Sequence, residues 1–254
     1  MLWEPESPLT VDDEEWQIES WRWLLDKFNG TQTLRKRRLV EPTAEFFPSA
    51  EKQGHAQAEY VFGLTAKLMG LSPDRFRLIP QEEAINPHVG PLAIVRNAPS
   101  SPAGTFRFGR RRSRITYEPG LVARPMDLVA TFAHELCHAL LKRKGKPPGG
   151  YQNNEFATDL AVTFFGFGIF GANAAFHFGQ YSNHSTGTQG WSTRRIGYLA
   201  EIEWGFSLAL FALSTDTPDE RIEGYLDVTP AASFRRSLEY LRANPAIIQR
   251  ALSA

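Results

Sequence analysis

Two histidines and a glutamate stand within one short segment, His134-Glu135-Leu136-Cys137-His138. Histidines four positions apart are separated by about 40° around a helix, so both imidazoles point to the same side and can bind one divalent metal ion. Glu135 lies about 100° from His134, beside the metal, where its carboxylate can take a proton from a bound water. The spacing therefore predicts a metal centre with a general base.

A third ligand is needed, and the next predicted helix offers carboxylates in the sequence NEFATD. Asn153 or Asn154 suits the cap of that helix, and Glu155 and Asp159 lie four residues apart on one face. The Glu155 carboxylate near a helix N-terminus is also stable without a metal. Asp159 stands among apolar residues, where an unpartnered carboxylate is costly. We therefore expect Asp159 to bond to a ligating histidine.

HELCH followed by NEFATD resembles the gluzincin group of zinc metallopeptidases. The residues that match the Zn²⁺ ligands of that group are His134, His138 and Glu155. The resemblance implies a zincin-like fold and a peptidase activity in which Glu135 is the general base. It also implies that Asp159 orients a ligand histidine, foremost His134.

Peptide hydrolysis also needs a group that stabilises the developing oxyanion. The candidates after the third ligand are Tyr181, His184, Arg194, Arg195 and Tyr198. We favour Tyr198, because a phenol on a rigid helix is held in place. The alternative, a tyrosine half-buried between helices without a catalytic role, stays open.

The segment Arg114–Tyr117 resembles the edge strand along which zincins align a peptide. Strand alternation puts Ile115 and Tyr117 on one face, and we expect both to bind substrate. The basic run Arg110 to Arg112 would then line one end of the cleft and favour acidic residues in the peptide.

The overall charge gives no argument for a general affinity for polyanions. The chain has 28 basic and 28 acidic residues, so its net charge is zero. This balance argues against nucleic acid or an anionic membrane as the main partner, and a peptide or protein substrate is expected instead. Two arginine-rich runs, at 35–38 and 107–114, could still bind nucleic acid or an acidic peptide, but a solvated face paired with the acidic N-terminus is the preferred interpretation.

The elements around the motif are mainly helices in the C-terminal half. Pro125 suits the first helical position and Gly145 suits the end of the motif helix. We expect helices at about 125–143, 154–165, 192–213 and 231–252, the last broken at Pro245. Glycines at 166, 168 and 171 match a dinucleotide-binding pattern literally, yet they follow a helix, and close helix packing is the better interpretation.

The N-terminal half mixes helices with short strands. A helix capped by Asp12 or Asp13 should end at Gly30, and a second should cover 56–69. Strand-like runs occur at 75–79, 91–96 and 114–117. We thus predict a single zincin-like α+β domain over 1–254. Its halves would be 1–124, with a small mixed sheet, and 125–254, mainly helical and carrying the metal site.

The expected location is the cytoplasm. Cys137 is the single cysteine, which excludes an internal disulfide, and no apolar stretch is long enough to span a bilayer. The N-terminal residues lack the basic and apolar regions of a signal peptide. Two alternatives to a zinc hydrolase remain: a zinc-bearing scaffold or interaction protein without turnover, and a basic-patch binding module in which HExxH is accidental.

Overall fold

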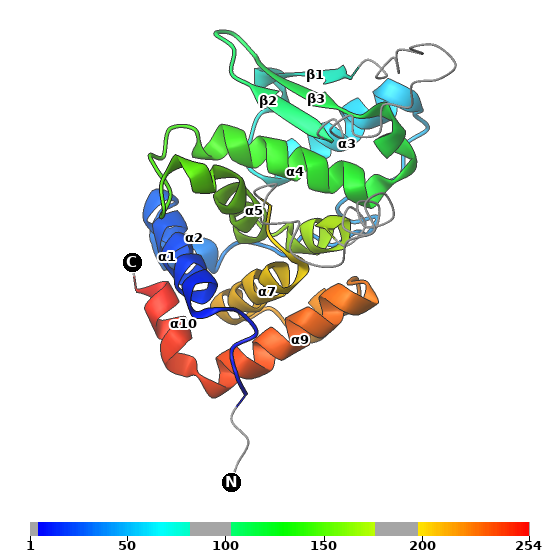
Figure 1. The fold of residues 1–254 in the computed structure, drawn as a ribbon. Coiled ribbons are helices and arrows are strands. Elements are labelled where there is room, and N and C mark those ends of the chain that lie inside the picture. The colour runs from blue at the N-terminus through cyan, green and yellow to red at the C-terminus, as the bar shows by residue number, and fades with distance from the viewer. Residues whose placement is uncertain (1–4, 82–102, 176–197, 254) are drawn as a thin grey trace, which may run out of the picture. The chain divides into compact units, whose positions relative to one another are not determined.

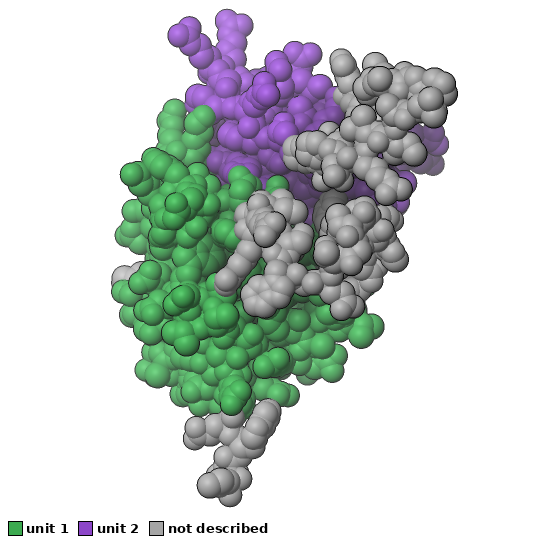
Figure 2. All heavy atoms as spheres, viewed as in Figure 1, with its two compact units in different colours: residues 1–48, 140–254 green, residues 49–139 purple. Residues whose placement is uncertain are grey.

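The structure is a computed structural model that describes residues 5–81, 103–175 and 198–253 (Figure 1). Within these residues the chain is mainly helical and has one three-stranded mixed sheet, which confirms the predicted α+β class. The chain forms two compact units, 49–139 and the combination of 1–48 with 140–254 (Figure 2). This grouping differs from the expected halves, because the first 48 residues associate with the later helices and most of the motif helix belongs with the sheet.

The sheet lies in the unit formed by residues 49–139. Its strands are β1 (Phe76–Pro80), β2 (Gly104–Arg107) and β3 (Ser113–Tyr117), in the order β1-β3-β2. β1 runs parallel to β3, and β2 runs antiparallel to β3 as the first half of a hairpin. Strands at 75–79 and 114–117 are thus confirmed, the one expected at 91–96 lies outside the described residues, and β2 was not predicted.

One face of the sheet is covered by helices α3 (Gly54–Leu68) and α4 (Pro125–Leu141). Phe62 of α3 makes edge contacts with Phe76 of β1 and Phe132 of α4, at ring-centroid distances of 5.8 and 5.3 Å. Tyr117 of β3 contacts the same Phe132 ring at 5.7 Å. Such aromatic pairs contribute beyond their buried area, so this cluster sets the position of α4 on the sheet.

The second unit is built from helices. They are α1 (Val11–Lys27), α2 (Gly30–Leu34), α5 (Asn154–Phe164), α7 (Glu201–Thr215), α8 (Asp219–Glu223), α9 (Val228–Ala243), α10 (Pro245–Leu252) and a helix that begins at residue 168. Pro245 opens α10, which confirms the predicted break. The cap of α1 is Thr10, whose hydroxyl accepts the Asp13 N–H at 3.3 Å, so the expected cap at Asp12 or Asp13 is wrong by two or three residues.

Helix α7 begins at Glu201, later than the predicted position 192. The Ala200 N–H donates to the Glu203 carboxylate at 2.6 Å, and this side-chain bond satisfies a backbone donor at the start of the helix. Residues 198–200 lead into α7 without regular secondary structure, while 192–197 lie outside the described residues. In the part of the chain that is described, no helix is long and apolar enough to cross a membrane.

Glycines allow α7 to pack closely against its neighbours. A Cβ on Gly168 would lie 2.6 Å from Leu208 of α7, and one on Gly171 would overlap the Trp204 ring, which confirms close packing for this glycine pattern. At Gly205 of α7, a Cβ would lie 2.6 Å from the Ser233 carbonyl carbon of α9. The backbone cannot rotate away as a side chain can, so the close approach of α7 and α9 requires glycine at position 205.

We expect Gly205→Ala to destabilise the protein by about 1–3 kcal/mol, the usual cost of overpacking a core. The matched control is Gly63→Ala in α3, where a Cβ would meet nothing within 4 Å. That change should stabilise by about 0.5–1 kcal/mol, because alanine loses less backbone entropy in a helix. Urea unfolding measures both. Equal effects of the two substitutions would contradict the close α7–α9 contact.

Candidate metal centre

Helix α4 is a firm support for the HExxH residues. Its first turn is held by an ion pair of 3.1 Å between Arg124 Nη1 and Asp127 Oδ2, and the Thr131 hydroxyl donates to the Asp127 carbonyl at 2.8 Å. The helix contains no glycine between Pro125 and Leu141. Its fully buried side chains are Phe132, Ala133, Leu136 and Cys137. The burial of Cys137 agrees with a structural thiol.

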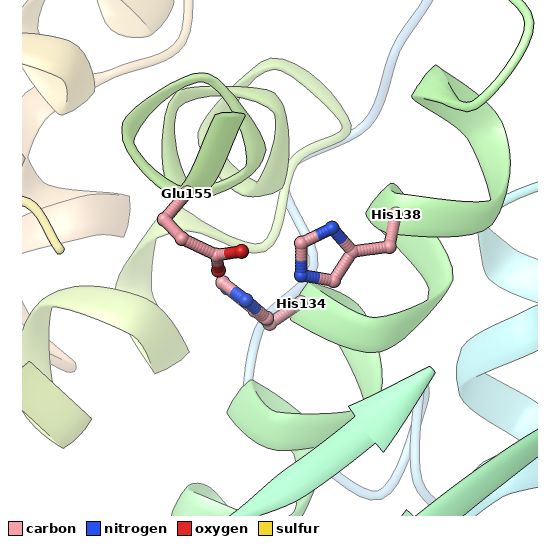
Figure 3. Close-up of side chains that lie close together, drawn as sticks. All are labelled: His134, His138 and Glu155. Atoms are coloured by element: carbon pink, nitrogen blue, oxygen red, sulfur yellow. The ribbon is translucent and has the colours of Figure 1, made fainter. Parts of the chain in front are cut away.

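The two histidines of α4 lie next to each other and extend from one side of the helix (Figure 3). The centroids of the His134 and His138 rings are 4.7 Å apart, and the ring planes are nearly perpendicular, at 84°. Both side chains are half-buried. The i, i+4 spacing of the two histidines predicted this arrangement.

The third residue, Glu155, lies in the first turn of α5. The loop before α5 is fixed by the Pro148 carbonyl, which accepts the Trp16 indole N–H at 3.0 Å and the Asn153 side-chain N–H at 3.2 Å. These bonds tie the loop to α1 and to the start of α5. Along α5, Phe156 contacts Trp16 at a ring-centroid distance of 5.9 Å. The start of α5 is therefore positioned by α1.

His134, His138 and Glu155 each offer one ligand atom, and these three atoms all lie within 4.8 Å of one another (Figure 3). Ligand atoms on one tetrahedral zinc ion are about 3.3 Å apart, so side-chain adjustments of about 1.5 Å or less would close the group on an ion. Two imidazoles with one carboxylate form a donor set that catalytic zinc sites use, and other divalent metals accept it as well. The residues present thus fit a bound metal ion.

Glu135 follows His134 on α4 and is 5% exposed. Strand β2 passes beside it: a Cβ on Gly104 would lie 3.0 Å from Glu135 Oε1 and 2.8 Å from the Thr131 methyl group. A larger residue at this position would push against both side chains, so glycine lets the backbone of β2 lie near the carboxylate. A single glycine in a loop-rich stretch of sequence does not indicate a close backbone contact, so the role of Gly104 was not predicted.

Asp159 is 4% exposed, and the structure gives its carboxylate a partner that the sequence did not predict. Asp159 Oδ2 accepts the Leu199 N–H at 3.0 Å, which ties α5 to the chain just before α7. Its bond to His134 stays a prediction. Tyr198 precedes Leu199 and α7, outside any helix, so its predicted place on a helix is wrong, and its side chain is 38% exposed. Its role at an oxyanion also stays a prediction.

Ile115 and Tyr117 do not occupy an edge strand. They lie in β3, which is bonded on both sides, and they are 0% and 1% exposed. The Tyr117 hydroxyl lies 3.0 Å from His55 Nδ1, and burial together with the nearby Glu59 charge raises the pKa of Tyr117. Both residues belong to the core, so the expectation that they meet substrate is wrong. Among the described strands, β2 is an outer one, and its Gly104 lies beside Glu135.

Comparison with known proteins yields no match to a family model, a curated protein or a solved structure. The chemistry of this chain must therefore be judged from its own residues. The group formed by His134, His138 and Glu155 is the feature that bears on it most directly.

We expect the purified protein to bind about one zinc ion per chain. Replacing His134 or His138 by Ala, or Glu155 by Gln, should weaken binding by more than the roughly 10- to 100-fold typical of changes in outer residues. His55→Ala is the control, because His55 bonds to Tyr117 and is not one of the three. Competition with a chromophoric chelator measures the affinity. Unchanged affinity in the His134/His138 double variant would refute this site.

Two substitutions at Asp159 separate its two candidate roles. Asp159→Asn keeps an oxygen that can accept the Leu199 N–H, whereas Asp159→Ala removes it. If the carboxylate charge orients His134, both variants should lose zinc affinity by about 10- to 100-fold. If Asp159 only anchors Leu199, Asp159→Ala alone should lose stability, by about 1–3 kcal/mol, because a buried donor is left unpaired. Chelator competition and urea unfolding distinguish the two results.

Proposed function

We propose that the protein is a zinc-dependent peptidase with a gluzincin-type site on a zincin-like fold. The observation that carries the proposal is the group of His134, His138 and Glu155, with Glu135 beside it on α4. Three protein ligands leave a fourth position for water, which is the pattern of catalytic zinc sites, whereas structural sites use four protein ligands. Among the described residues, no fourth histidine, cysteine, aspartate or glutamate joins the group.

The chain supplies the proton transfers of such a hydrolysis. A bound zinc ion would polarise a water molecule and lower its pKa toward about 7. Glu135 would accept the proton of the attacking water and later donate it to the leaving amine nitrogen. Burial of Glu135 suits this role, because a site with little water strengthens the electrostatic interactions that act on the reacting groups.

Strand β2 replaces Arg114–Tyr117 as the element that would align a peptide. It passes beside Glu135 at Gly104, so an extended substrate paired with β2 would run about 4.8 Å from that strand and close to the base. Tyr198 remains the proposed oxyanion group, because the bond from Leu199 to Asp159 holds its segment against α5. The substrate is thus proposed to be an extended peptide segment.

A zinc-bearing protein without turnover is the other candidate. Such a protein would have the same three ligands, but a protein group would occupy the fourth coordination position of the metal in place of water. The absence of a fourth ligand from the described part of the chain favours the peptidase.

Glu135→Gln tests the chemistry apart from the metal. The variant should keep zinc and the fold, because the ligands are untouched, and should lose hydrolysis by at least about 100-fold, since general base catalysis contributes about 10²–10⁴. Glu118→Gln is the control, because Glu118 is exposed and lies outside the site. Mass spectrometry of a digested peptide library measures the activity. A zinc-loaded parent that cleaves no peptide would indicate the protein without turnover, and full activity in Glu135→Gln would exclude this mechanism.

A further inference from the structure

Three arginines lie side by side across the sheet. Arg114 of β3 is the register partner of Arg77 on β1 and of Arg107 on β2. Paired residues project to the same face of a sheet, and neighbouring strands are about 4.8 Å apart, so the three Cα atoms fall within about 10 Å. All three residues are exposed, while Leu78 and Ile115, their neighbours in sequence, are buried. The arginines therefore occupy the face opposite the helices α3 and α4.

The β2–β3 hairpin extends this positive surface. Its loop carries Arg110, Arg111 and Arg112, all exposed, and Phe108, which is 53% exposed. Figure 1 shows the loop projecting beyond the paired part of the strands. Residues 104–117 include no aspartate or glutamate. We call the following six residues the arginine face: Arg77, Arg107, Arg110, Arg111, Arg112 and Arg114.

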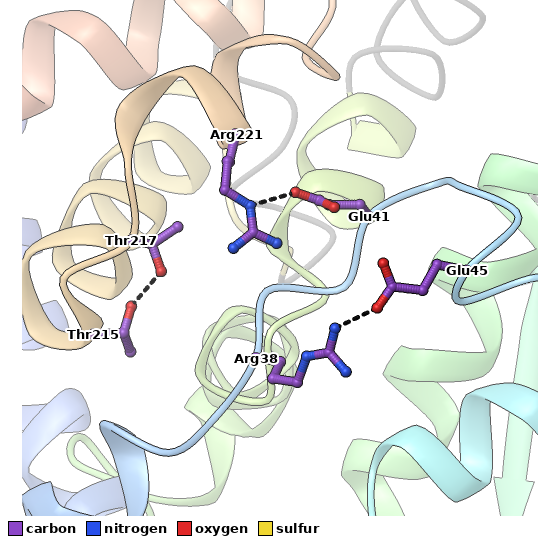
Figure 4. Close-up of polar contacts among 6 residues, drawn as sticks. All are labelled: Arg38, Glu41, Glu45, Thr215, Thr217 and Arg221. Carbon is purple, nitrogen blue, oxygen red and sulfur yellow. Dashed lines mark hydrogen bonds and ion pairs between the residues drawn. The ribbon is translucent and has the colours of Figure 1, made fainter.

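No side chain of the arginine face has an ion-pair partner within residues 5–81, 103–175 and 198–253. Several basic residues of the helical unit do have such partners. Arg38 pairs with Glu45, and Arg221 pairs with Glu41 at 2.8 Å (Figure 4). In the first arginine-rich run Arg38 thus has an acidic partner, whereas no arginine of the second run has one among the described residues.

Like charges placed directly opposite each other destabilise a sheet, so the row of three arginines lowers the stability of the folded protein. The zero net charge of the whole chain conceals a local excess of positive charge in the unit that holds the sheet. Residues 49–139 hold eleven basic and eight acidic residues, and the rest of the chain holds seventeen basic and twenty acidic ones. A ligand with regularly spaced negative charges would supply what the unit lacks.

We propose that the arginine face binds single-stranded nucleic acid. The guanidinium group forms paired hydrogen bonds with phosphate, and all six cations of the face are arginines. Phe108 supplies an exposed ring on which an unpaired base can stack, a contact that neither a duplex nor an acidic peptide makes in this way. The proposal goes beyond the peptidase function and uses none of the residues assigned to the metal centre.

The test is fluorescence anisotropy of a labelled 20-nucleotide single strand, with a 20-base-pair duplex and poly-glutamate as competitors. The row variant is Arg77→Gln, Arg107→Gln and Arg114→Gln together. It should lose at least about ten-fold in affinity at low salt, and the slope of log K against log salt should fall by about 2, since each contact to a single strand contributes about 0.7. The control removes the same charge from exposed positions in α9 and α10, namely Arg235, Arg236 and Arg250, and should bind as the parent does.

Phe108→Ala distinguishes stacking from charge alone. It should weaken binding several-fold without changing the salt slope, because it removes no cation. Equal affinity of the row variant and the control would overturn the proposal. So would poly-glutamate that competes as well as the single strand, which would indicate an acidic peptide, or tighter binding of the duplex. Glu135→Gln should bind as the parent does, so failure of the peptidase proposal leaves this test unaffected.

A stability measurement completes the test. If the row is kept for a ligand, Arg114→Gln should raise Tm at low salt, by roughly 1–4 °C, because it relieves repulsion on both sides of β3. A fall in Tm would show that Arg114 serves the fold, and would overturn the proposal. Added single strand should raise the Tm of the parent more than that of the row variant.

Discussion

The burial of one side of α4 is the constraint on which the HExxH arrangement depends. Phe132 is enclosed by Phe62 and Tyr117, so the helix cannot rotate on the sheet without breaking that aromatic cluster. With that side fixed, His134 and His138 project together from the other, with their rings 4.7 Å apart. The same packing leaves Glu135 beside β2. Core packing and site geometry are therefore two consequences of one buried helix face.

The helices that local signals define could be predicted from the sequence. Pro125 marks the start of the motif helix and Pro245 divides α9 from α10, because proline acts through the backbone of its own position, whereas the motif helix ends at Leu141, four residues before the expected cap at Gly145. The i, i+4 histidines belong to the same class of local information. Glu155 could be chosen because it follows in the next helix.

What could not be predicted depends on contacts between distant segments. β2 has four residues and no clear alternation, and its pairing with β3 is what makes it a strand. Arg77 and Arg114 become neighbours only through the parallel register of β1 and β3. The same pairing buries Ile115 and Tyr117 in a central strand. The Leu199 N–H bonds to Asp159, 40 positions earlier in the sequence, and no sequence pattern near either residue predicts that bond.

The Pro148 carbonyl also has a consequence for the chain as a whole. It accepts bonds from Trp16 and Asn153, so α1 holds the turn that precedes Glu155. A shortened polypeptide lacking α1 would retain the HExxH motif and would still lose the anchor of the segment that positions Glu155. Loss of the first helix would thus leave the motif intact and disturb the group of His134, His138 and Glu155 through a change more than a hundred residues away from Glu155.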